Sequence, residues 1–244
     1  MRKSFRVLFL IILSVSTCGF CFGQIEIQNA GVPYQMKINE TTPITDKATG
    51  NKISYQDFVR MTKEDRRAYS LEPVINEYGQ PGAYELRRVT KEEYETGQIT
   101  NLDLTKRPKP GETLPLVVLK GMDGQEYRST DLKGRVIVLG FWMTFKRPFW
   151  DAGRAKEFEN ILKPYGSSIA TFGILECSKQ EVSEAMAVGS LPFTPIPDSY
   201  GFHKKFVITT IPSFIVVDKE GKVVAYIEGT EVNELKKALI STSE

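Results

Sequence analysis

The side chains best suited to chemistry gather around one stretch near the middle of the chain. Lys146 and Arg147 are adjacent cations that follow an apolar run at residues 136–141. A run this rich in β-branched residues predicts a central strand that is buried on both faces. Backbone N–H groups at the start of a following helix, with two cations beside them, would suit a carboxylate or a phosphate. Anion binding is therefore the first candidate chemistry.

The element after the strand decides whether such a site forms. Pro148 and Asp151 predict a helix that begins here and runs to about Tyr165, because proline and acidic residues favour the first helical turn. Two cations at that N-terminus would oppose the helix dipole, at about 0.3 to 1 kcal/mol each. A bound anion would offset this cost, but Asp151 or solvent would do so without any ligand.

A thiol is the second candidate. Cys177 follows a predicted strand at residues 168–175, and carboxyl ends of parallel strands share one edge of a sheet. A thiol of low pKa there would react with peroxide or pair with a partner's cysteine, whereas a buried thiol would be inert. The only histidine, His203, is interpreted as a surface residue. We expect no metal site and no cofactor, because a Cys/His site needs more ligands.

The first 23 residues are expected to be a secretory signal peptide. Three basic residues precede an apolar run at residues 7–15, and small residues precede a cleavage point after Gly23. One alternative is a lipoprotein anchored through Cys18, although Val-Ser-Thr before it departs from the usual lead-in. A retained anchor is the other, but the run is shorter than the ~20 residues that a membrane span needs. We expect a mature chain from Gln24, without a membrane span, in the periplasm or cell envelope.

Signal cleavage changes the charge and the cysteine count. The full chain has a formal charge of +2, and losing three basic residues brings the mature chain near −1. That balance gives no electrostatic reason to expect nucleic acid as a partner. Cys18 and Cys21 would leave with the signal, so Cys177 would be the only thiol. A catalytic dithiol needs two cysteines and is not expected.

The patterns predict an α/β fold preceded by a polar extension. Residues 24–110 are polar and keep no clear period apart from a helix that Ser54 opens, and they end in Lys106-Arg-Pro-Lys-Pro-Gly111. The prolines and glycine of that segment predict a linker. Strand and helix patterns alternate over residues 111–244, as a sheet flanked by helices requires. The sequence thus predicts a central mixed sheet in a C-terminal domain.

The segment Lys133–Trp142, with the sequence KGRVIVLGFW, resembles the start of thioredoxin-like domains of the TlpA/ResA type, relatives of the redoxin and alkyl hydroperoxide reductase/thiol-specific antioxidant proteins. Those domains continue with Ala-Thr-Trp-Cys-x-x-Cys. Here Lys146 and Phe149 stand at the two cysteine positions, around Arg147-Pro148, and Gly140 stands where thioredoxins place a buried carboxylate. The resemblance implies a thioredoxin-like fold and a place in cell redox homeostasis, with a degenerate active site.

Thr210-Ile-Pro-Ser213 is the second match. The resemblance implies a cis-proline at Pro212, opposite the Cys-x-x-Cys turn, where active relatives pair their backbone with an extended substrate. A proline that opens an interior strand also suggests a cis bond on its own. Phe145 and Trp150 would then join Ile211 and Pro212 in an apolar groove for a peptide, whereas the default for aromatic residues is the core.

Two functional hypotheses follow. The first is an exported binding or scaffold module of the cell envelope, which has lost dithiol chemistry and holds a protein or an extended peptide in the cis-proline groove. The second is a thiol-dependent antioxidant or oxidoreductase that works through Cys177 alone. The reactivity of that one thiol separates the two hypotheses.

Overall fold

The C-terminal half of the chain is built around the strand predicted at residues 136–141. We describe the protein from a computed structural model, which describes residues 38–99, 101–229 and 232–242. They belong to one compact unit, Met36–Glu244. The expected signal peptide, with its cleavage site after Gly23 and the alternative anchor Cys18, lies outside the described residues.

A five-stranded mixed sheet carries the predicted strand at its centre. Its order is β11-β10-β7-β8-β9, in which β7, β8 and β9 are parallel and β10 is antiparallel to β7 and β11. The strands are β7 (Val136–Trp142), β8 (Ile169–Leu175), β9 (Thr194–Ile196), β10 (Ser213–Val217) and β11 (Val223–Glu228). This arrangement confirms the predicted α/β class with a central mixed sheet.

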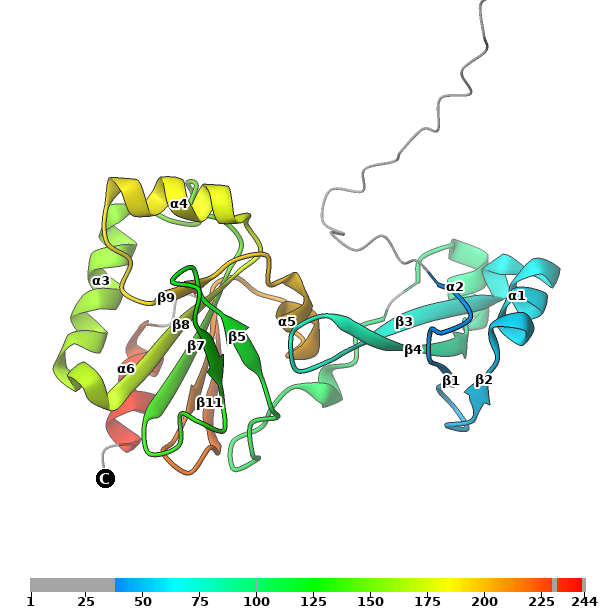
Figure 1. Ribbon diagram of the computed structural model, residues 1–244, viewed down its shortest axis with the longest axis horizontal. Coiled ribbons are helices and arrows are strands. Elements are labelled where there is room, and N and C mark those ends of the chain that lie inside the picture. The colour runs from blue at the N-terminus through cyan, green and yellow to red at the C-terminus, as the bar shows by residue number, and fades with distance from the viewer. Residues whose placement is uncertain (1–37, 100, 230–231, 243–244) are drawn as a thin grey trace, which may run out of the picture. The chain divides into compact units, whose positions relative to one another are not determined.

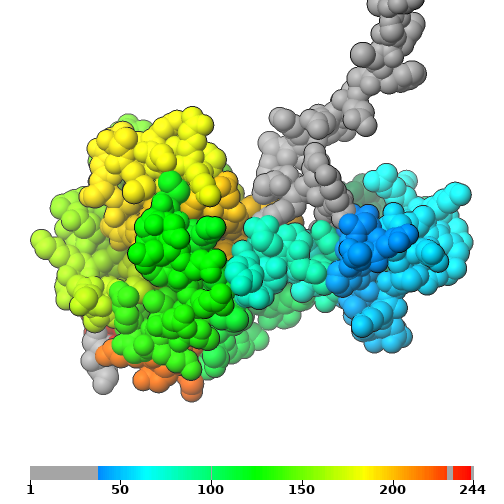
Figure 2. Space-filling model, in the orientation of Figure 1, coloured from blue at the N-terminus to red at the C-terminus, as the bar shows by residue number. Residues whose placement is uncertain are grey.

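Helices cover both faces of this sheet (Figure 1). Successive residues of a strand point to opposite faces, so Val138 and Trp142 join one core cluster while Leu139 and Phe141 join the other. The first cluster packs under α3 (Ala152–Leu162), α4 (Lys179–Val188) and α6 (Val232–Ser241). The second packs under α5 (Tyr200–Lys205) and the hairpin of β5 (Val118–Lys120) and β6 (Glu126–Arg128). In Figure 2 that hairpin, in green, forms part of the outer surface of this half.

The N-terminal extension contains a second sheet, which the sequence did not predict. Its order is β2-β1-β4-β3, and its strands are β1 (Ile44–Asp46), β2 (Lys52–Ile53), β3 (Tyr69–Ile75) and β4 (Pro81–Arg88). Helix α1 (Tyr55–Glu64) begins as predicted after Ser54, whose hydroxyl accepts a hydrogen bond from the N–H of Asp57. Helix α2 (Lys91–Thr96) follows the sheet. Single turns of 3₁₀ helix lie at Arg66–Ala68 and Leu104–Lys106, and a longer 3₁₀ segment, kinked at Gly166, lies at Lys163–Ser168.

The sequence did not indicate the second sheet because polar side chains occupy some of its buried positions. Ser70 and Glu72 on β3 are buried, so the strand shows no alternation of apolar and polar residues. Arg87 compensates the Glu72 carboxylate with a bond of 2.7 Å from its Nε, and Lys47 adds a bond of 2.6 Å. The same Arg87 also binds both carboxylate oxygens of Glu93 at 2.7 Å. This paired network supplements a small apolar core, since burying a lone charge would be costly.

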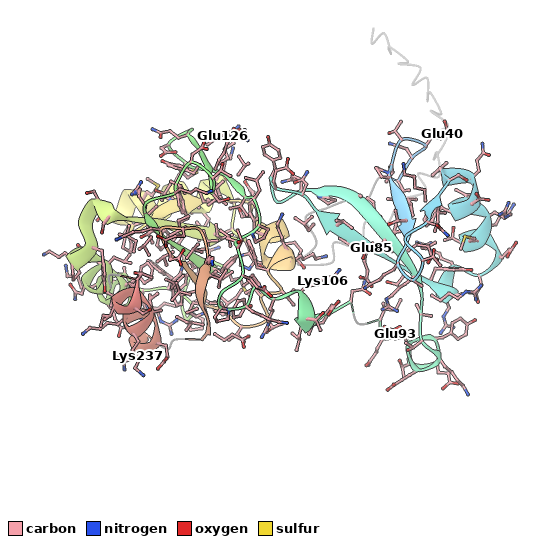
Figure 3. The ribbon with its side chains drawn as sticks, turned by 90° about the horizontal axis from the view of Figure 1, so that it is seen from below. Glu40, Glu85, Glu93, Lys106, Glu126 and Lys237 are labelled. Carbon is pink, nitrogen blue, oxygen red and sulfur yellow. The ribbon has the colours of Figure 1, made fainter. Side chains whose placement is uncertain are left out.

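The predicted linker lies against β11 rather than passing freely between two sheets. The N–H of Gly111 donates to the carbonyl of Val223 at 2.8 Å, and the N–H of Leu114 donates to Gly221 at 2.9 Å. One step earlier, Lys106 forms an ion pair of 3.7 Å with Glu85 of β4, and both are labelled in Figure 3. A division of the mature chain at residues 110 and 111 stays a prediction.

Candidate functional site

Three segments that carry the predicted site residues meet at one edge of the five-stranded sheet. The parallel strands β7 and β8 end there, with Trp142 opposite Leu175. Strand β10 runs the other way and begins there, since Ser213 lies opposite Phe141. The turn at 143–149, the strand end at 176–178 and the loop before Pro212 therefore converge, as the sequence predicts for parallel strands.

The turn at 143–149 is not helical, which corrects the predicted helix start. Helix α3 begins at Ala152, and Asp151 is its N-cap, because the Asp151 carboxylate accepts the N–H of Arg154 at 3.0 Å. That hydrogen bond lowers the pKa of Asp151. The Arg147–Pro148 peptide bond is cis, and Pro148 lies in the turn rather than in the first turn of the helix. Lys146 and Arg147 consequently do not lie at a helix N-terminus, so the dipole argument for an anion site does not apply to them.

Glu181 of helix α4 holds this turn in place. One of its carboxylate oxygens accepts the Thr144 hydroxyl and the N–H of Phe145, the latter at 2.9 Å. The other oxygen lies 3.8 Å from the ammonium of Lys146. Partial burial on its own would raise the pKa of Glu181. The hydrogen bonds and the charge of Lys146 together have the larger effect, so the pKa of Glu181 is lowered. Glu181 thus lies beside Lys146, whose ammonium is 76% exposed and remains largely solvated.

The aromatic residues of the predicted groove differ in their burial. Trp150 is only 8% exposed, and its ring lies edge-on to Trp142 at 4.9 Å and to Phe193 at 5.6 Å between ring centres. Phe145 is half-buried and packs edge-on against Trp150 at 5.4 Å. Phe149 is also half-buried. Trp150 therefore belongs to the core, and the half-buried phenylalanines provide the apolar surface at the turn.

The loop before β10 presents free backbone groups. The Ile211–Pro212 peptide bond is cis. The carbonyl of Thr210 accepts the hydroxyl of Ser213 at 2.6 Å, and the carbonyl of Pro212 accepts the N–H of Gly229 at 2.8 Å. Within the described part of the chain, neither the N–H nor the C=O of Ile211 has a hydrogen-bond partner. This half-buried residue can still pair with another backbone.

Cys177 lies at the predicted sheet edge but is poorly placed for thiolate chemistry. Only 9% of its surface is exposed, and it is the one free cysteine among the residues that the structure describes. Burial raises the pKa of Cys177 to about 12, and the negative charge of Glu181 adds to the effect. A neutral thiol is a weak nucleophile, so the geometry favours an inert side chain.

His203 is buried, contrary to the expected surface position. Its ring is 4% exposed and lies edge-on to Phe141, with Nε2 at 3.1 Å from the carbonyl of Ile174 and Nδ1 at 3.2 Å from Glu176. Burial lowers the pKa of His203 to about 4 and raises that of Glu176. With Nε2 donating to the carbonyl, Nδ1 carries a lone pair and has no hydrogen-bond partner among the described residues, although the Glu176 carboxyl lies beside it. The sequence suggested a surface position because two lysines follow His203. Helix α5 has only six residues, which is too short to show the spacing of a buried face.

Gly140 leaves an unpartnered group in the core. The indole N–H of Trp142 is buried without a hydrogen-bond partner among the described residues, and a Cβ at Gly140 would lie 3.0 Å from that nitrogen. The resemblance places a carboxylate at this position in thioredoxins. Gly140 has no side chain, so the buried indole N–H of Trp142 has no such acceptor here.

No group of three or more His, Cys, Asp or Glu side chains is placed to hold a metal ion in the described ranges.

No family model matches the chain. Among characterised proteins, it is similar to the thiol-disulfide oxidoreductase ResA of Geobacillus thermodenitrificans, with 30% identity over 129 residues that cover 51% of this chain and 72% of that protein. The chain belongs to the ResA family of thioredoxin-like proteins. The thioredoxin-like protein YneN of Bacillus subtilis is 24% identical over 115 residues, which cover 46% of this chain and 66% of that one.

Two solved structures are also similar to this chain. A thioredoxin-family thiol:disulfide interchange protein from Chlorobium tepidum has a TM-score of 0.45 at 18% identity, covering 57% of this chain and 98% of that one. A thiol-disulfide oxidoreductase from Bacteroides fragilis has a TM-score of 0.43 at 22% identity, covering 52% of this chain and 98% of that one. The central mixed sheet and the 30% identity to ResA carry the assignment, which confirms the predicted resemblance.

Proposed function

We propose that this ResA-family chain is an exported, non-catalytic module that binds a protein or an extended peptide at the groove beside Pro212. The observation that carries the proposal is the turn that follows β7. Lys146 and Phe149 stand at the two positions that the family resemblance assigns to the cysteines. An ammonium and a phenyl group can neither attack a disulfide nor resolve a mixed disulfide, so the dithiol reaction has no reacting atoms there.

The groove keeps the features that binding needs. The backbone of Ile211 is free to pair with an added strand, and main-chain hydrogen bonds are a general source of affinity for extended peptides. Beside it, Phe145 and Phe149 offer half-buried apolar surface, and Lys146 and Arg147 are exposed. These features support binding without any need for a reactive group.

The alternative function, a one-cysteine antioxidant or oxidoreductase, depends on Cys177. Burial and the raised pKa of this thiol, about 12, argue against it. The residue also lies at the end of β8 and not in the turn that the family uses for its reacting sulfurs. The first experiment below is therefore designed to detect this alternative function.

Export is part of the proposal and rests on the N-terminal sequence. The basic residues, the apolar run and the small residues before Gln24 are those of a cleaved signal. Among the residues that the structure describes, no helix is both long and apolar enough to cross a bilayer. The proposed location is the periplasm or cell envelope.

The first test measures reduction of a disulfide-containing peptide by the full chain with dithiothreitol as the electron donor. We expect no acceleration over dithiothreitol alone, and no change in the Cys177→Ser variant. A Lys146→Cys/Phe149→Cys double variant serves as the positive control, because it restores a dithiol to the same turn. Turnover by the unmodified chain that disappears in Cys177→Ser would refute the proposal and establish the alternative.

The second test measures binding directly. Peptides without cysteine are selected from a random library on the full chain, and the selected peptide is titrated while backbone amide signals are followed by NMR. We expect the largest changes at Ile211 and in the turn at 143–149. Failure to select any peptide, or changes confined to other regions, would contradict a groove at this edge.

A further inference from the structure

The segment that leads into Ile211 has a strained backbone. Val207 has φ of 53°, in the left-handed region that a β-branched residue rarely adopts. The side chain of Val207 is buried, so the segment cannot relax outward without losing core contacts. Residues held in such conformations persist only where surrounding contacts fix them, and they concentrate at binding and switch regions. The contacts that fix Val207 therefore matter for the groove.

Arg107 of the linker supplies one of these contacts and also reaches the residues that follow Val207. Its Nε donates to the carbonyl of Val207 at 3.1 Å, and one terminal nitrogen donates to the hydroxyl of Thr209. The two terminal nitrogens also bind both carboxylate oxygens of Glu228, at 3.1 and 2.9 Å. Glu228 in turn accepts the hydroxyls of Thr209 at 2.9 Å and Thr210 at 3.3 Å. One guanidinium thus joins the linker, the end of β11 and the loop before Pro212.

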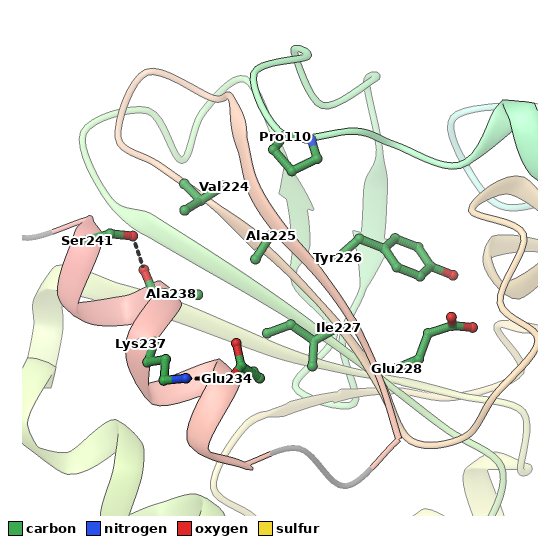
Figure 4. A pocket seen from close by; sticks show the side chains of 10 residues that line it. All are labelled: Pro110, Val224, Ala225, Tyr226, Ile227, Glu228, Glu234, Lys237, Ala238 and Ser241. Carbon is green, nitrogen blue, oxygen red and sulfur yellow. Dashed lines mark hydrogen bonds and ion pairs between the residues drawn. The ribbon is translucent and has the colours of Figure 1, made fainter.

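Tyr226 completes the arrangement. The guanidinium of Arg107 lies 5.0 Å above its ring, and the Tyr226 hydroxyl donates to the carbonyl of Val207 at 3.1 Å. Figure 4 shows Tyr226 and Glu228 on β11 with their side chains directed away from α6. The side chain of Arg107 is only 20% exposed. A lysine could not reproduce this set, because only the planar guanidinium combines bidentate pairing with stacking and a third direction of donation.

We propose that Arg107 is the positioning residue of the peptide groove: it holds residues 207–210 and so fixes the backbone of Ile211 for pairing. The inference rests on the proposed binding function and adds a residue of the predicted linker. It assigns the linker a part in the site, through contacts to residues 100 to 121 positions later in the chain. The side chain touches the loop, and the loop is expected to touch the peptide.

The test is hydrogen–deuterium exchange on the full chain, with the variants Arg107→Gln and Arg107→Lys. In Arg107→Gln we expect the amides of Val207 and Ile208, which donate to the carbonyls of Lys204 and His203, to exchange about tenfold faster or more, while those of β7 keep their protection. Arg107→Lys should give an intermediate increase. Arg88→Gln is the matched control, because Arg88 also stacks on a tyrosine ring, at 5.2 Å from Tyr69, but its side chain makes no hydrogen bond to residues 207–211.

Peptide affinity is the second readout. The peptide selected on the unmodified chain should bind Arg107→Gln at least about tenfold more weakly, and Arg88→Gln equally well. Unchanged loop exchange, faster exchange throughout the five-stranded sheet, or unchanged affinity would each overturn the positioning role. If no peptide binds the unmodified chain, the proposed function fails by itself, and the exchange measurement still decides whether Arg107 holds the loop.

Discussion

Glu181 offers the sharpest test of how the turn at 143–149 is held. In Glu181→Ala the N–H of Phe145 and the hydroxyl of Thr144 lose their acceptor. Hydrogen bonds to a charged group contribute about 1.5 to 3 kcal/mol, and the pair with Lys146 adds little, because that ammonium is 76% exposed. We expect a loss of about 2 kcal/mol for Glu181→Ala and about 1 kcal/mol for Glu181→Gln, which keeps a carbonyl acceptor.

Urea unfolding at pH 7 measures these differences, and thermal unfolding should show a fall of about 4 to 8 °C for Glu181→Ala. Glu184→Ala on the same helix is the control, since Glu184 is exposed and accepts a bond only from Gln180. The folded pKa of Glu181 lies below its unfolded value of 4.5, so its contribution is present above that value and fades as the pH falls through the folded pKa. The gap between the unmodified chain and Glu181→Ala should therefore narrow on acidification.

Either of two results would refute this reasoning. One is a Glu181→Ala variant as stable as Glu184→Ala at pH 7. The other is a gap that stays constant as the pH is lowered, because an uncharged role for the side chain would not titrate. A further readout comes from Cys177, whose pKa the Glu181 charge helps to raise. In Glu181→Gln that pKa should fall, while burial keeps it above the value of a free thiol.

Three further predictions concern other parts of the chain. Alkylation of Cys177 by iodoacetamide at pH 8 should be about 10³-fold slower than that of free cysteine, since burial raises the pKa of this thiol to about 12. The alkylation rate should rise as the pH approaches 12. Fast labelling at pH 8 would contradict this prediction. Glu176→Gln should lose less than about 1 kcal/mol in urea unfolding, because the carboxyl is partly buried, which raises its pKa, and its side chain makes no hydrogen bond among the described residues; a loss of more than about 3 kcal/mol would contradict this. Arg87→Met should destabilise the chain by about 3 kcal/mol, since it removes the guanidinium that pairs with both Glu72 and Glu93 while Lys47 still pairs with Glu72, whereas the exposed Arg60→Met should cost less than about 0.5 kcal/mol; similar losses for both would contradict the network.

The sequence predicted those elements whose pattern follows from burial alone. Strand β7 is buried along its whole length, so its continuous apolar run admits one interpretation. Strand β3 shows the opposite case, because Ser70 and Glu72 occupy its buried positions and erase the alternation. The helix start after β7 was placed at Pro148 on local preference, but the hydrogen bond of Asp151 to Arg154 sets it at Ala152.

The site was predicted only in part, for a related reason. Strand order brings the turn at 143–149, Cys177 and Pro212 to one edge, and a parallel sheet allows that inference without coordinates. Glu181 and Arg107 were missed because their partners lie 36 to 121 residues away, and no local pattern marks such pairs. His203 was missed because its charged neighbours suggested a surface segment.

The position of Arg107 also affects how this protein can be divided for experiments. A boundary at residue 110 follows composition, and a fragment that begins at Gly111 would contain all five strands of the mixed sheet. It would nevertheless lack the guanidinium that fixes Val207 and Thr209. On the proposed positioning role, the segment needed for binding would begin a few residues before Gly111. An excised domain of normal stability and poor affinity would report on the choice of cut, not on the native groove.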